Sequence, residues 1–258
     1  MKILRASKDP YFKRIRELRT REGRKLEQRF LIEDEGLLQQ ALDARFPLES
    51  VLVGAHAREE DTRSWLDPLP SEVGRYALSE GLLHKLFPTG RRPRVVAVAK
   101  IRQQGIATLT GRQRCLVLED IQDAGNLGTL LRTAEGLGYS DVVMLESSVS
   151  DLYNRICVRA SMGSLFRVRL YHAPLGALRA RLDREGMKLL CTAPGGDGDL
   201  QNVDRSGSLA VALGNETRGC SASLLEAADL HVRIQMRGQV ESLNVAVCAG
   251  AVLHHLGG

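Results

Sequence analysis

Short apolar runs alternate with stretches of helical spacing through the second half of the chain. Each run is followed by a polar loop and then by a segment whose apolar residues lie three and four positions apart. A continuous apolar run between turn signals is typical of a strand buried on both faces. This pattern predicts strands at 115–120, 142–145, 166–170, 188–193, 209–213 and 231–234.

The segments between these runs predict helices. Their expected ranges are 127–136, 151–162, 174–184, 221–228 and 242–256. Strands that alternate with helices form a parallel sheet covered by helices on both faces. The fold class expected from the pattern is therefore α/β.

The first hundred residues predict a smaller α/β unit. Apolar spacing over 12–42 indicates two helices, or a helix, a strand and a helix, because Gly23 and residues 30–32 interrupt the helical pattern. Strands at 50–55 and 94–101, a helix over 59–68, and a strand followed by a helix over 74–87 complete this unit. We expect a domain at 1–101, a polar linker at 102–113 and a second domain at 114–258.

Positive charge is concentrated at the beginning of the chain. The 258 residues carry a net charge of +5, yet the first thirty contain eleven Lys or Arg against four acidic residues. Such a gradient indicates a polyanionic partner bound at one end of the molecule. A solvated basic helix, interrupted by its own acidic residues, is the alternative.

Other features of the composition restrict the choice of protein class. The five cysteines are single and lie mostly in apolar patterns, so we expect buried reduced thiols and no metal site. The first ten residues are charged, and the longest apolar runs are far shorter than the roughly 20 residues of a membrane span. These features predict a cytoplasmic protein.

Three loops that follow predicted strands carry the candidate chemistry. Loops at the carboxyl ends of parallel strands meet at one edge of a sheet, where open α/β sheets bind ligands. In chain order, the candidates are Asn126, Arg132, Gly214, Asn215, Glu216, Ser242 and Asn244. The sequence lacks GxGxxG at a helix start, GxxxxGK[ST] and GxSxG, which argues against the usual dinucleotide, nucleotide and serine-hydrolase sites.

Each candidate also has a structural explanation. Asn126 and Ser242 are good helix N-caps, and Glu216 could be a capping-box acid. Arg132 could be a solvated helix residue, although apolar neighbours suggest burial beside an acidic or phosphate partner. Asn244 could simply stabilise the first turn of the last helix. The recurrence of polar residues in three such loops favours a functional cleft.

These loops resemble the three ordered motifs of the SpoU/TrmH branch of the SPOUT RNA 2′-O-ribose methyltransferases. The matching stretches are NLGTLLRTAEGLG, LGNETRG and IQMRGQVESLNVAV, and the resemblance covers about 114–258. FLIEDEGLLQQAL and PRVVAVAK are similar to the small ribosomal-protein-like substrate-binding domain that often precedes this fold. The resemblance implies a parallel-sheet SPOUT domain with a C-terminal trefoil knot, preceded by a small α/β RNA-binding domain.

The resemblance also implies methyl transfer from S-adenosyl-L-methionine to a ribose 2′-hydroxyl in RNA. The implied catalytic residues are Arg132, Asn126, Glu216, Ser242 and Asn244. The implied cofactor-binding residues are Thr192, Ala193, Leu213, Gly214, Asn215, Ile234, Met236, Ser242 and Leu243. The expected RNA-binding residues are Lys13, Arg14, Arg21, Arg24, Lys25, Arg91 and Arg92. The family usually has proline where Gln235 stands and glycine where Thr217 stands.

Ribosomal RNA is the favoured substrate because of the extra N-terminal domain, and tRNA is the alternative. A homodimer is implied by the family, and the last helix supports it because its residues are apolar on every side. Arg132 is expected to orient the nucleotide, since a guanidinium resists deprotonation. A non-catalytic RNA-binding or ribosome-assembly protein and a small-molecule α/β enzyme are the other possibilities.

Overall fold

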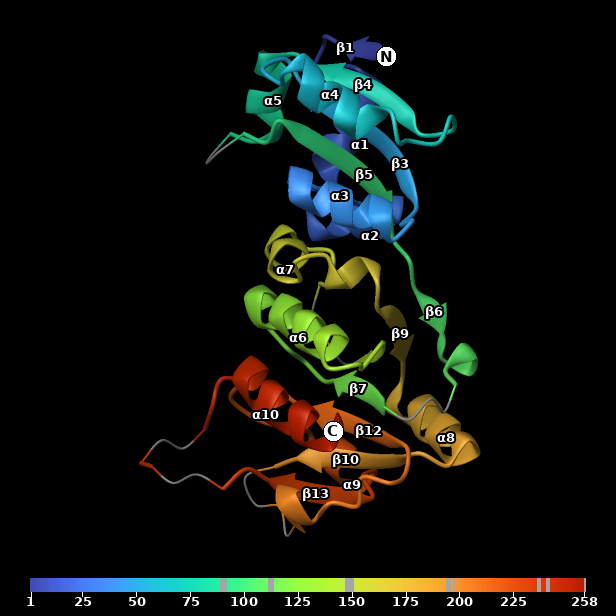
Figure 1. The fold of residues 1–258 in the computed structure, drawn as a ribbon, viewed down its shortest axis with the longest axis vertical. Coiled ribbons are helices and arrows are strands. Elements are labelled where there is room, and N and C mark those ends of the chain that lie inside the picture. Colours follow the sequence, from blue (N-terminus) through green and yellow to red (C-terminus); the bar gives the residue numbers. More distant parts are fainter. Residues whose placement is uncertain are drawn as a thin grey trace. The chain divides into compact units, whose positions relative to one another are not determined.

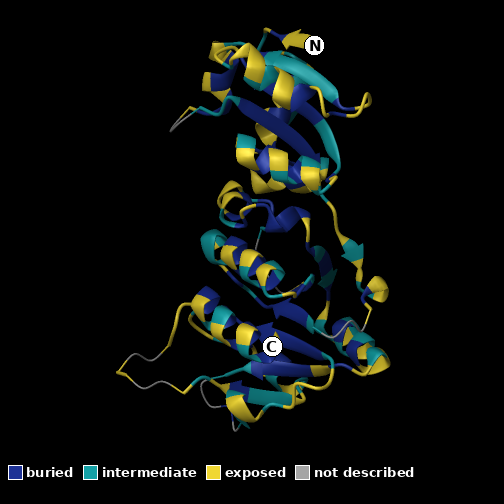
Figure 2. Ribbon diagram, viewed as in Figure 1, coloured by how far each residue is buried: buried dark blue, intermediate teal, exposed yellow. Residues whose placement is uncertain are grey.

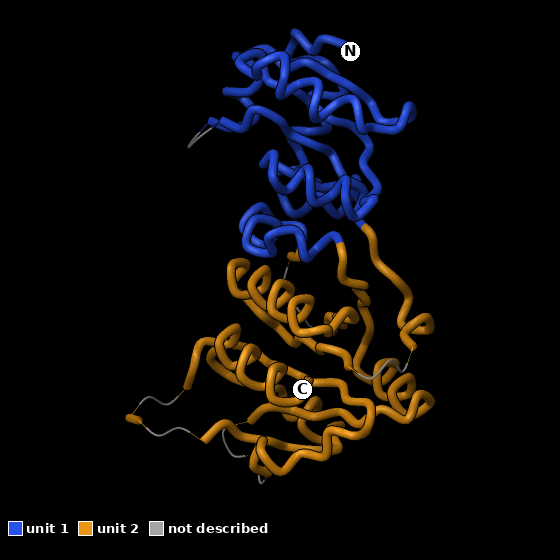
Figure 3. Tube along the Cα trace, viewed as in Figure 1, with its two compact units in different colours: residues 1–101, 153–166 blue, residues 102–152, 167–258 orange. Residues whose placement is uncertain are grey.

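The chain folds into two compact units in a computed structural model. Its described residues are 1–88, 92–110, 114–146, 151–193, 196, 198–235, 238–239 and 242–257. Unit 1 comprises Met1–Ile101 and Tyr153–Phe166, and unit 2 comprises Arg102–Leu152 and Arg167–Gly258 (Figure 3). The segment 153–166, which lies within the predicted second domain, thus folds with the first unit.

Unit 2 is built on a sheet whose strands are all parallel. Across the described residues the order is β11-β13-β10-β12-β7-β8-β9-β6. Their bounds are β6 Gln104–Gly105, β7 Arg114–Leu118, β8 Asp141–Leu145, β9 Arg169–Ala173, β10 Lys188–Thr192, β11 Gly198–Asp199, β12 Leu209–Leu213 and β13 Leu230–Arg233. The predicted α/β class with a parallel sheet is confirmed.

Helices cover this sheet, and its central strands are therefore buried (Figures 1 and 2). The helices are α6 Ala124–Gly136, α8 Leu175–Glu185, α9 Ala222–Glu226 and α10 Val245–Gly257, with short 3₁₀ turns at Ile106–Thr108 and Leu200–Asn202. Cys115 and Val117 of β7 share a core with Leu178 of α8 and Leu224 of α9. Helices α6 and α10 pack against each other. Burial on both faces explains why these strands have no polar alternation.

Several boundaries differ from those predicted. The helix expected at 151–162 is only α7 Arg155–Ala160, because the Asn154 side chain caps it by accepting from the Ile156 N–H. The strand expected from Phe166 begins at Arg169, because Ser164–Phe166 forms a 3₁₀ turn. In the predicted linker, Gln104–Gly105 pairs with β9, and residues 111–113 lie outside the described ones.

Unit 1 has a five-stranded mixed sheet in the order β1-β4-β3-β5-β2, counted over its described residues. The strands are β1 Lys2–Leu4, β2 Arg29–Ile32, β3 Leu48–Gly54, β4 Gly74–Leu78 and β5 Val95–Lys100. The helices are α1 Pro10–Glu17, α2 Arg21–Glu27, α3 Glu35–Asp43, α4 Glu59–Leu66, α5 Glu80–Leu86 and α7. The helix–strand–helix alternative for 12–42 is correct in its strand and its last helix, but the first helix is divided into α1 and α2.

Aromatic contacts explain why the segment 153–166 belongs to unit 1. The ring of Tyr153 lies 4.8 Å from that of Phe30, and the ring of Phe166 lies 5.1 Å from that of Phe46. All four side chains are buried, so a large apolar area is removed from water at this junction. No described helix has the length and apolar character needed to cross a membrane.

Candidate functional site

A cavity of about 720 Å³ lies where β10, β12 and β13 end and α10 begins. Parallel pairing of β10 with both β12 and β13 brings their carboxyl ends to one edge of the sheet. Its volume is within the range of roughly 300–1,000 Å³ that is usual for small-molecule sites. Its lining includes the predicted residues Thr192, Ala193, Leu213, Gly214, Asn215, Glu216, Ile234, Ser242 and Leu243.

The loop after β12 is a tight turn that forms one wall of the cavity. Asn215 and Gly219 exchange backbone hydrogen bonds of 3.0 and 2.9 Å, and the Asn215 Oδ1 accepts from the N–H groups of Thr217 and Arg218. A Cβ on Gly214 would lie 2.3 Å from the backbone of Gly219, so only glycine fits there. Thr217 has no positive φ, so the glycine usual in the family is not required at this position.

Glu216 connects this loop to the start of α6. Its carboxylate accepts from the backbone N–H groups of Gln122 and Asp123, both at 3.3 Å, and from the Asn126 Nδ2 at 3.2 Å. Free N–H groups at a helix N-terminus favour a negative charge. Glu216 therefore does not act as a capping-box acid within its own segment, where Ser221 caps α9.

Asn126 extends this connection to the start of α10. Its Oδ1 accepts from the Asn244 Nδ2 at 2.9 Å, while the Asn244 Oδ1 accepts from the Ala246 N–H at 2.9 Å. Asn244 is thus the N-cap of α10, and Asp123, rather than Asn126, caps α6. The side chains of Glu216, Asn126 and Asn244 form one continuous chain of hydrogen bonds that unites the three predicted loops.

Arg132 does not belong to this chain of hydrogen bonds. It lies six residues beyond Asn126 on α6, which is about 9 Å along a helix and on another face. Its side chain is exposed rather than buried, and it forms no hydrogen bond or ion pair with any residue that the structure describes. Ser242 lines the cavity, whereas Met236 lies outside the described residues.

Two acidic residues directly after β7 also shape the site, and the sequence pattern alone did not single them out. The buried carboxylate of Glu119 accepts from the Ser221 N–H and Oγ, both at 2.7 Å. Asp120 accepts from the Asn215 Nδ2 and from Arg218, which orients the turn after β12. Their position at the end of a predicted buried strand was the only available signal. Within the described part of the chain, no group of three or more His, Cys, Asp or Glu side chains could hold a metal ion.

The predicted RNA-binding residues differ in their exposure. Lys13, Arg21 and Lys25 are exposed on unit 1, and Arg92 lies 3.4 Å from Glu80. Arg91 lies outside the described residues. Arg24 is only 6% exposed, and its Nη1 donates to the Leu18 carbonyl at 2.8 Å. Arg24 therefore stabilises the unit internally instead of presenting its charge at the surface.

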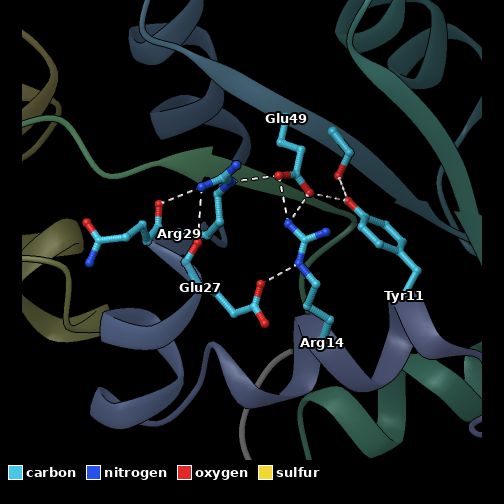
Figure 4. Close-up of polar contacts among 7 residues, drawn as sticks. Tyr11, Arg14, Glu27, Arg29 and Glu49 are labelled. Carbon is cyan, nitrogen blue, oxygen red and sulfur yellow. Dashed lines mark hydrogen bonds and ion pairs between the residues drawn. The ribbon is translucent and has the colours of Figure 1, made fainter.

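Arg14 also has internal partners, which Figure 4 shows. Its guanidinium donates to both oxygens of Glu49 at 2.7 and 2.8 Å and to Glu27 at 2.6 Å, and Arg29 donates to Glu49 at 2.6 Å. Burial opposes ionisation of the Glu49 carboxyl, but hydrogen bonds from Arg29 and Arg14 outweigh it, so its pKa is lowered. This cluster joins α1, α2, β2 and β3.

Comparisons with known proteins agree with this architecture. Residues 113–254, more than half of the chain, match the SpoU rRNA Methylase family, and residues 1–112 match the N-terminal domain of thiostrepton-resistance methylases. The 23S rRNA (guanosine(2553)-2′-O)-methyltransferase RlmP of Bacillus subtilis is 33% identical over the full length of both chains. A 23S rRNA (adenosine(1067)-2′-O)-methyltransferase of Streptomyces azureus is 29% identical over 72% of this chain and 74% of its own length.

The fold has close counterparts among solved structures. An AdoMet-bound rRNA methyltransferase from Sinorhizobium meliloti superposes with a TM-score of 0.89 at 23% identity, over 99% of this chain and 97% of that one. The resemblance stated from the three motifs is confirmed. This chain belongs to the SpoU rRNA methylase family.

Proposed function

We propose that this chain transfers a methyl group from S-adenosylmethionine to a ribose 2′-hydroxyl of 23S ribosomal RNA. The hydrogen-bonded chain of Glu216, Asn126 and Asn244 beside the cavity carries this proposal. The names of the Bacillus and Streptomyces relatives, both 23S rRNA 2′-O-methyltransferases, support the substrate. We expect the enzyme to act in the cytoplasm.

The cavity suits this cofactor by its size and its chemistry. Apolar side chains of Leu213, Ile234 and Leu243 offer a surface for an adenine ring, and the turn after β12 offers backbone groups. The Glu216 carboxylate suits a nearby positive charge. When bound, S-adenosylmethionine supplies an electrophilic methyl group on a sulfonium. Gln235 also lines the cavity, at the position where the family usually has proline.

The asparagine–glutamate chain would position the ribose. A 2′-hydroxyl is a poor nucleophile, and alignment for an in-line displacement can lower the barrier by several kcal/mol. Glu216 is held by two backbone N–H groups, and it fixes the amide of Asn126, which in turn fixes Asn244. Preorganised side chains of this kind lose little entropy when a substrate binds. We assign them the task of orienting the ribose, with Ser242 shaping the same cavity.

Arg132 would orient the RNA rather than remove its proton. A guanidinium stays protonated in proteins and pairs with phosphate oxygens in a bidentate manner. The exposed side chain of Arg132, which has no protein partner among the described residues, is available for such a contact. It would hold the phosphate next to the target ribose and stabilise negative charge on the 2′-oxygen, whose proton passes to water as the methyl group is transferred.

A homodimer would cover an apolar surface that one chain leaves exposed. On α10, Val247 is 59% exposed, and Leu243 just before the helix is 39% exposed. Gly250 and Ala251 add small residues on α10, and a Cβ on Gly250 would lie 4.0 Å from the Thr133 side chain of α6. Small and apolar residues on two packed helices allow the close approach of a second copy. We propose that two copies pair over α6 and α10, and that the C-terminal part of unit 2 is knotted, as is usual in the family.

Substitution of Arg132 tests the proposed function. We expect Arg132→Ala to abolish methyl transfer to 23S rRNA while the affinity for S-adenosylmethionine changes by less than about twofold, since Arg132 is not part of the cavity lining. Methyl transfer is measured with radiolabelled cofactor and cofactor binding by calorimetry. Arg184→Ala, which removes an exposed arginine from α8, is the matched control. Near-normal turnover by the Arg132 variant would refute this assignment.

A further inference from the structure

Glu33 is a buried carboxylate at the end of β2, surrounded by arginines. Its side chain is 7% exposed, and its Oε2 lies 2.6 Å from the Nε of Arg155, which is 43% exposed. Among the described residues, no donor reaches this oxygen with hydrogen-bond geometry, so the contact is an attraction between charges. Burial raises the pKa of Glu33, and four arginines oppose that shift: Arg155, Arg19, Arg159 and Arg24.

These arginines come from two distant parts of the sequence. Arg19 and Arg24 belong to α2 and the turn before it, whereas Arg155 and Arg159 lie one turn apart on α7. The aromatic contacts of Tyr153 and Phe166 hold the α7 segment within unit 1. We call Arg19, Arg24, Arg155, Arg159 and Glu33 the Glu33 cluster.

The Glu33 cluster carries more positive charge than its internal contacts use. Arg155 lies within ion-pair distance of the Glu33 carboxylate, and Arg19, Arg159 and Arg24 act on it from farther away. Arg24 is buried and bonded to the Leu18 carbonyl. Arg19 and Arg159 are exposed, and neither has a carboxylate within ion-pair distance among the residues that the structure describes. The Glu33 cluster therefore has two exposed arginines, Arg19 and Arg159, whose charges are not paired with a carboxylate of the described residues.

Two apolar side chains lie exposed on the same segment. Ile156 follows Arg155, and Met162 follows Arg159 by less than one turn of helix; each is 59% exposed. Met162 adopts a φ of +48°, a left-handed conformation that is unusual for a residue other than glycine. Exposed apolar side chains beside cations offer contact both to phosphates and to bases that are not stacked in a helix.

We propose that the exposed arginines of the Glu33 cluster bind the phosphate backbone of the RNA substrate, with Ile156 and Met162 in contact with an unstacked base. This inference rests on the proposed function, because it assigns a second contact surface to the same RNA. It means that RNA recognition is shared between the basic N-terminal residues and a segment inserted from the second half of the sequence. Arginine is suited to this task because its planar fork matches phosphate geometry.

A salt titration of RNA binding tests the proposal. The probe is an unmodified 23S rRNA transcript, and the variant is the double substitution Arg19→Gln with Arg159→Gln in the full chain. Both side chains are exposed, and Arg155 remains to pair with Glu33, so we expect the fold to persist. The affinity for RNA should fall. The slope of the logarithm of the RNA association constant against the logarithm of the salt concentration should become shallower by about 0.7–0.9 for each phosphate that the variant no longer binds.

Matched variants separate this effect from a general loss of charge. Arg58→Gln with Arg63→Gln removes two exposed arginines from the α4 region of the same unit and should leave the slope unchanged. Glu33→Gln removes the negative charge and should keep or raise RNA affinity. A wild-type affinity and slope in the Arg19/Arg159 variant would overturn the proposal.

The titration measures RNA binding without turnover. Its result is therefore independent of whether the chain transfers a methyl group. If the wild-type chain transfers no methyl group while the double variant shows the shallower slope, the Glu33 cluster binds RNA and the proposed reaction is wrong. If methyl transfer proceeds and the slope is unchanged, the reaction stands and the cluster plays no part in RNA binding.

Discussion

Asn244 performs two hydrogen-bonding tasks through the two atoms of one amide. Its Oδ1 caps α10, and its Nδ2 donates to Asn126 in the chain that reaches Glu216. Aspartate caps a helix as well as asparagine but lacks the Nδ2 donor. We therefore predict that Asn244→Asp changes the unfolding free energy by less than about 0.5 kcal/mol, because the cap is kept. Its methyl-transfer rate should fall at least tenfold.

The alanine variant at the same position provides the comparison. Asn244→Ala loses the cap as well as the donor, so its unfolding free energy should fall by about 1 kcal/mol. Thermal denaturation and single-turnover methyl transfer separate the two properties. Wild-type turnover by Asn244→Asp would mean that the link to Asn126 has no part in the reaction.

Gly214 illustrates a second property set by a single residue, the close approach of two backbone segments. An added Cβ would lie 2.3 Å from the Gly219 carbonyl and from the Cys220 nitrogen, so the turn must move. We predict that Gly214→Ala lowers the unfolding free energy by about 1–3 kcal/mol, as overpacking usually does. Calorimetry should show at least tenfold weaker binding of S-adenosylmethionine.

The control for this prediction is Gly176→Ala in the first turn of α8, where no heavy atom lies within 4 Å of the added Cβ. Its unfolding free energy should stay the same or rise by about 0.5–1 kcal/mol, since alanine is the better helix former. Equal cofactor affinity in both glycine variants would contradict the role assigned to the turn after β12.

At the scale of elements, the ion-pair cluster around Glu49 ties together four elements of unit 1 (Figure 4). The pKa of Glu49 in the folded state is lowered, because hydrogen bonds from Arg29 and Arg14 outweigh the effect of burial. A carboxyl whose folded pKa is depressed stabilises the fold above its unfolded pKa of about 4.3, and this stabilisation is lost as the pH falls through the folded pKa.

We therefore predict that Glu49→Gln lowers the unfolding free energy at pH 7, and that its difference from the wild type shrinks as the pH falls below about 4. Urea denaturation at several pH values measures this. Glu72→Gln, which alters an exposed glutamate of the same unit, should show no such dependence. A difference that stays constant between pH 7 and pH 3 would mean that the charge of Glu49 is not the source of stability.

Most strands could be predicted from the sequence because burial on both faces leaves an uninterrupted apolar run. The segment 153–166 could not be assigned correctly, because its association with Phe30 and Phe46 is a tertiary contact between residues more than 100 positions apart. β1 was missed because a strand of three residues has no detectable period. Local pattern predicts an element's type but not the unit that the element joins.

The residues of the site and of the RNA-binding surface also differ in whether their positions could be predicted from the sequence. Asn126, Glu216 and Asn244 were identified because each lies in a strand–loop–helix stretch of the sequence. The burial of Arg24 and the pairing of Arg14 could not be predicted, because nothing local distinguishes them from the exposed cations Lys13, Arg21 and Lys25. The sequence left two alternatives for Arg132, a solvated position and burial suggested by its apolar neighbours, and the structure has its side chain exposed.

At the scale of the whole molecule, we predict that a second copy of the chain covers α6 and α10. Val247 is exposed in one chain, so a charge there is tolerated by the monomer but would be buried without a partner in the dimer. We predict that the wild type elutes with twice the chain mass of 28.4 kDa and that Val247→Glu elutes as a monomer. Light scattering coupled to size exclusion measures both.

Leu26→Glu is the control for this substitution, because Leu26 is the most exposed large apolar residue of unit 1 and lies on α2. This variant should remain dimeric. A wild type that stays monomeric at micromolar concentration, or a Val247→Glu variant that remains dimeric, would contradict pairing over α10.

Mapping of ribose methylation determines whether this chain methylates a 2′-hydroxyl of 23S rRNA. The wild-type chain is incubated with S-adenosylmethionine and an unmodified 23S rRNA transcript, and the RNA is digested and analysed by mass spectrometry. We predict one new 2′-O-methylated nucleotide, absent without the cofactor and absent with Arg132→Ala. A methyl group on a base, or an unmodified transcript despite bound cofactor and RNA, would contradict it.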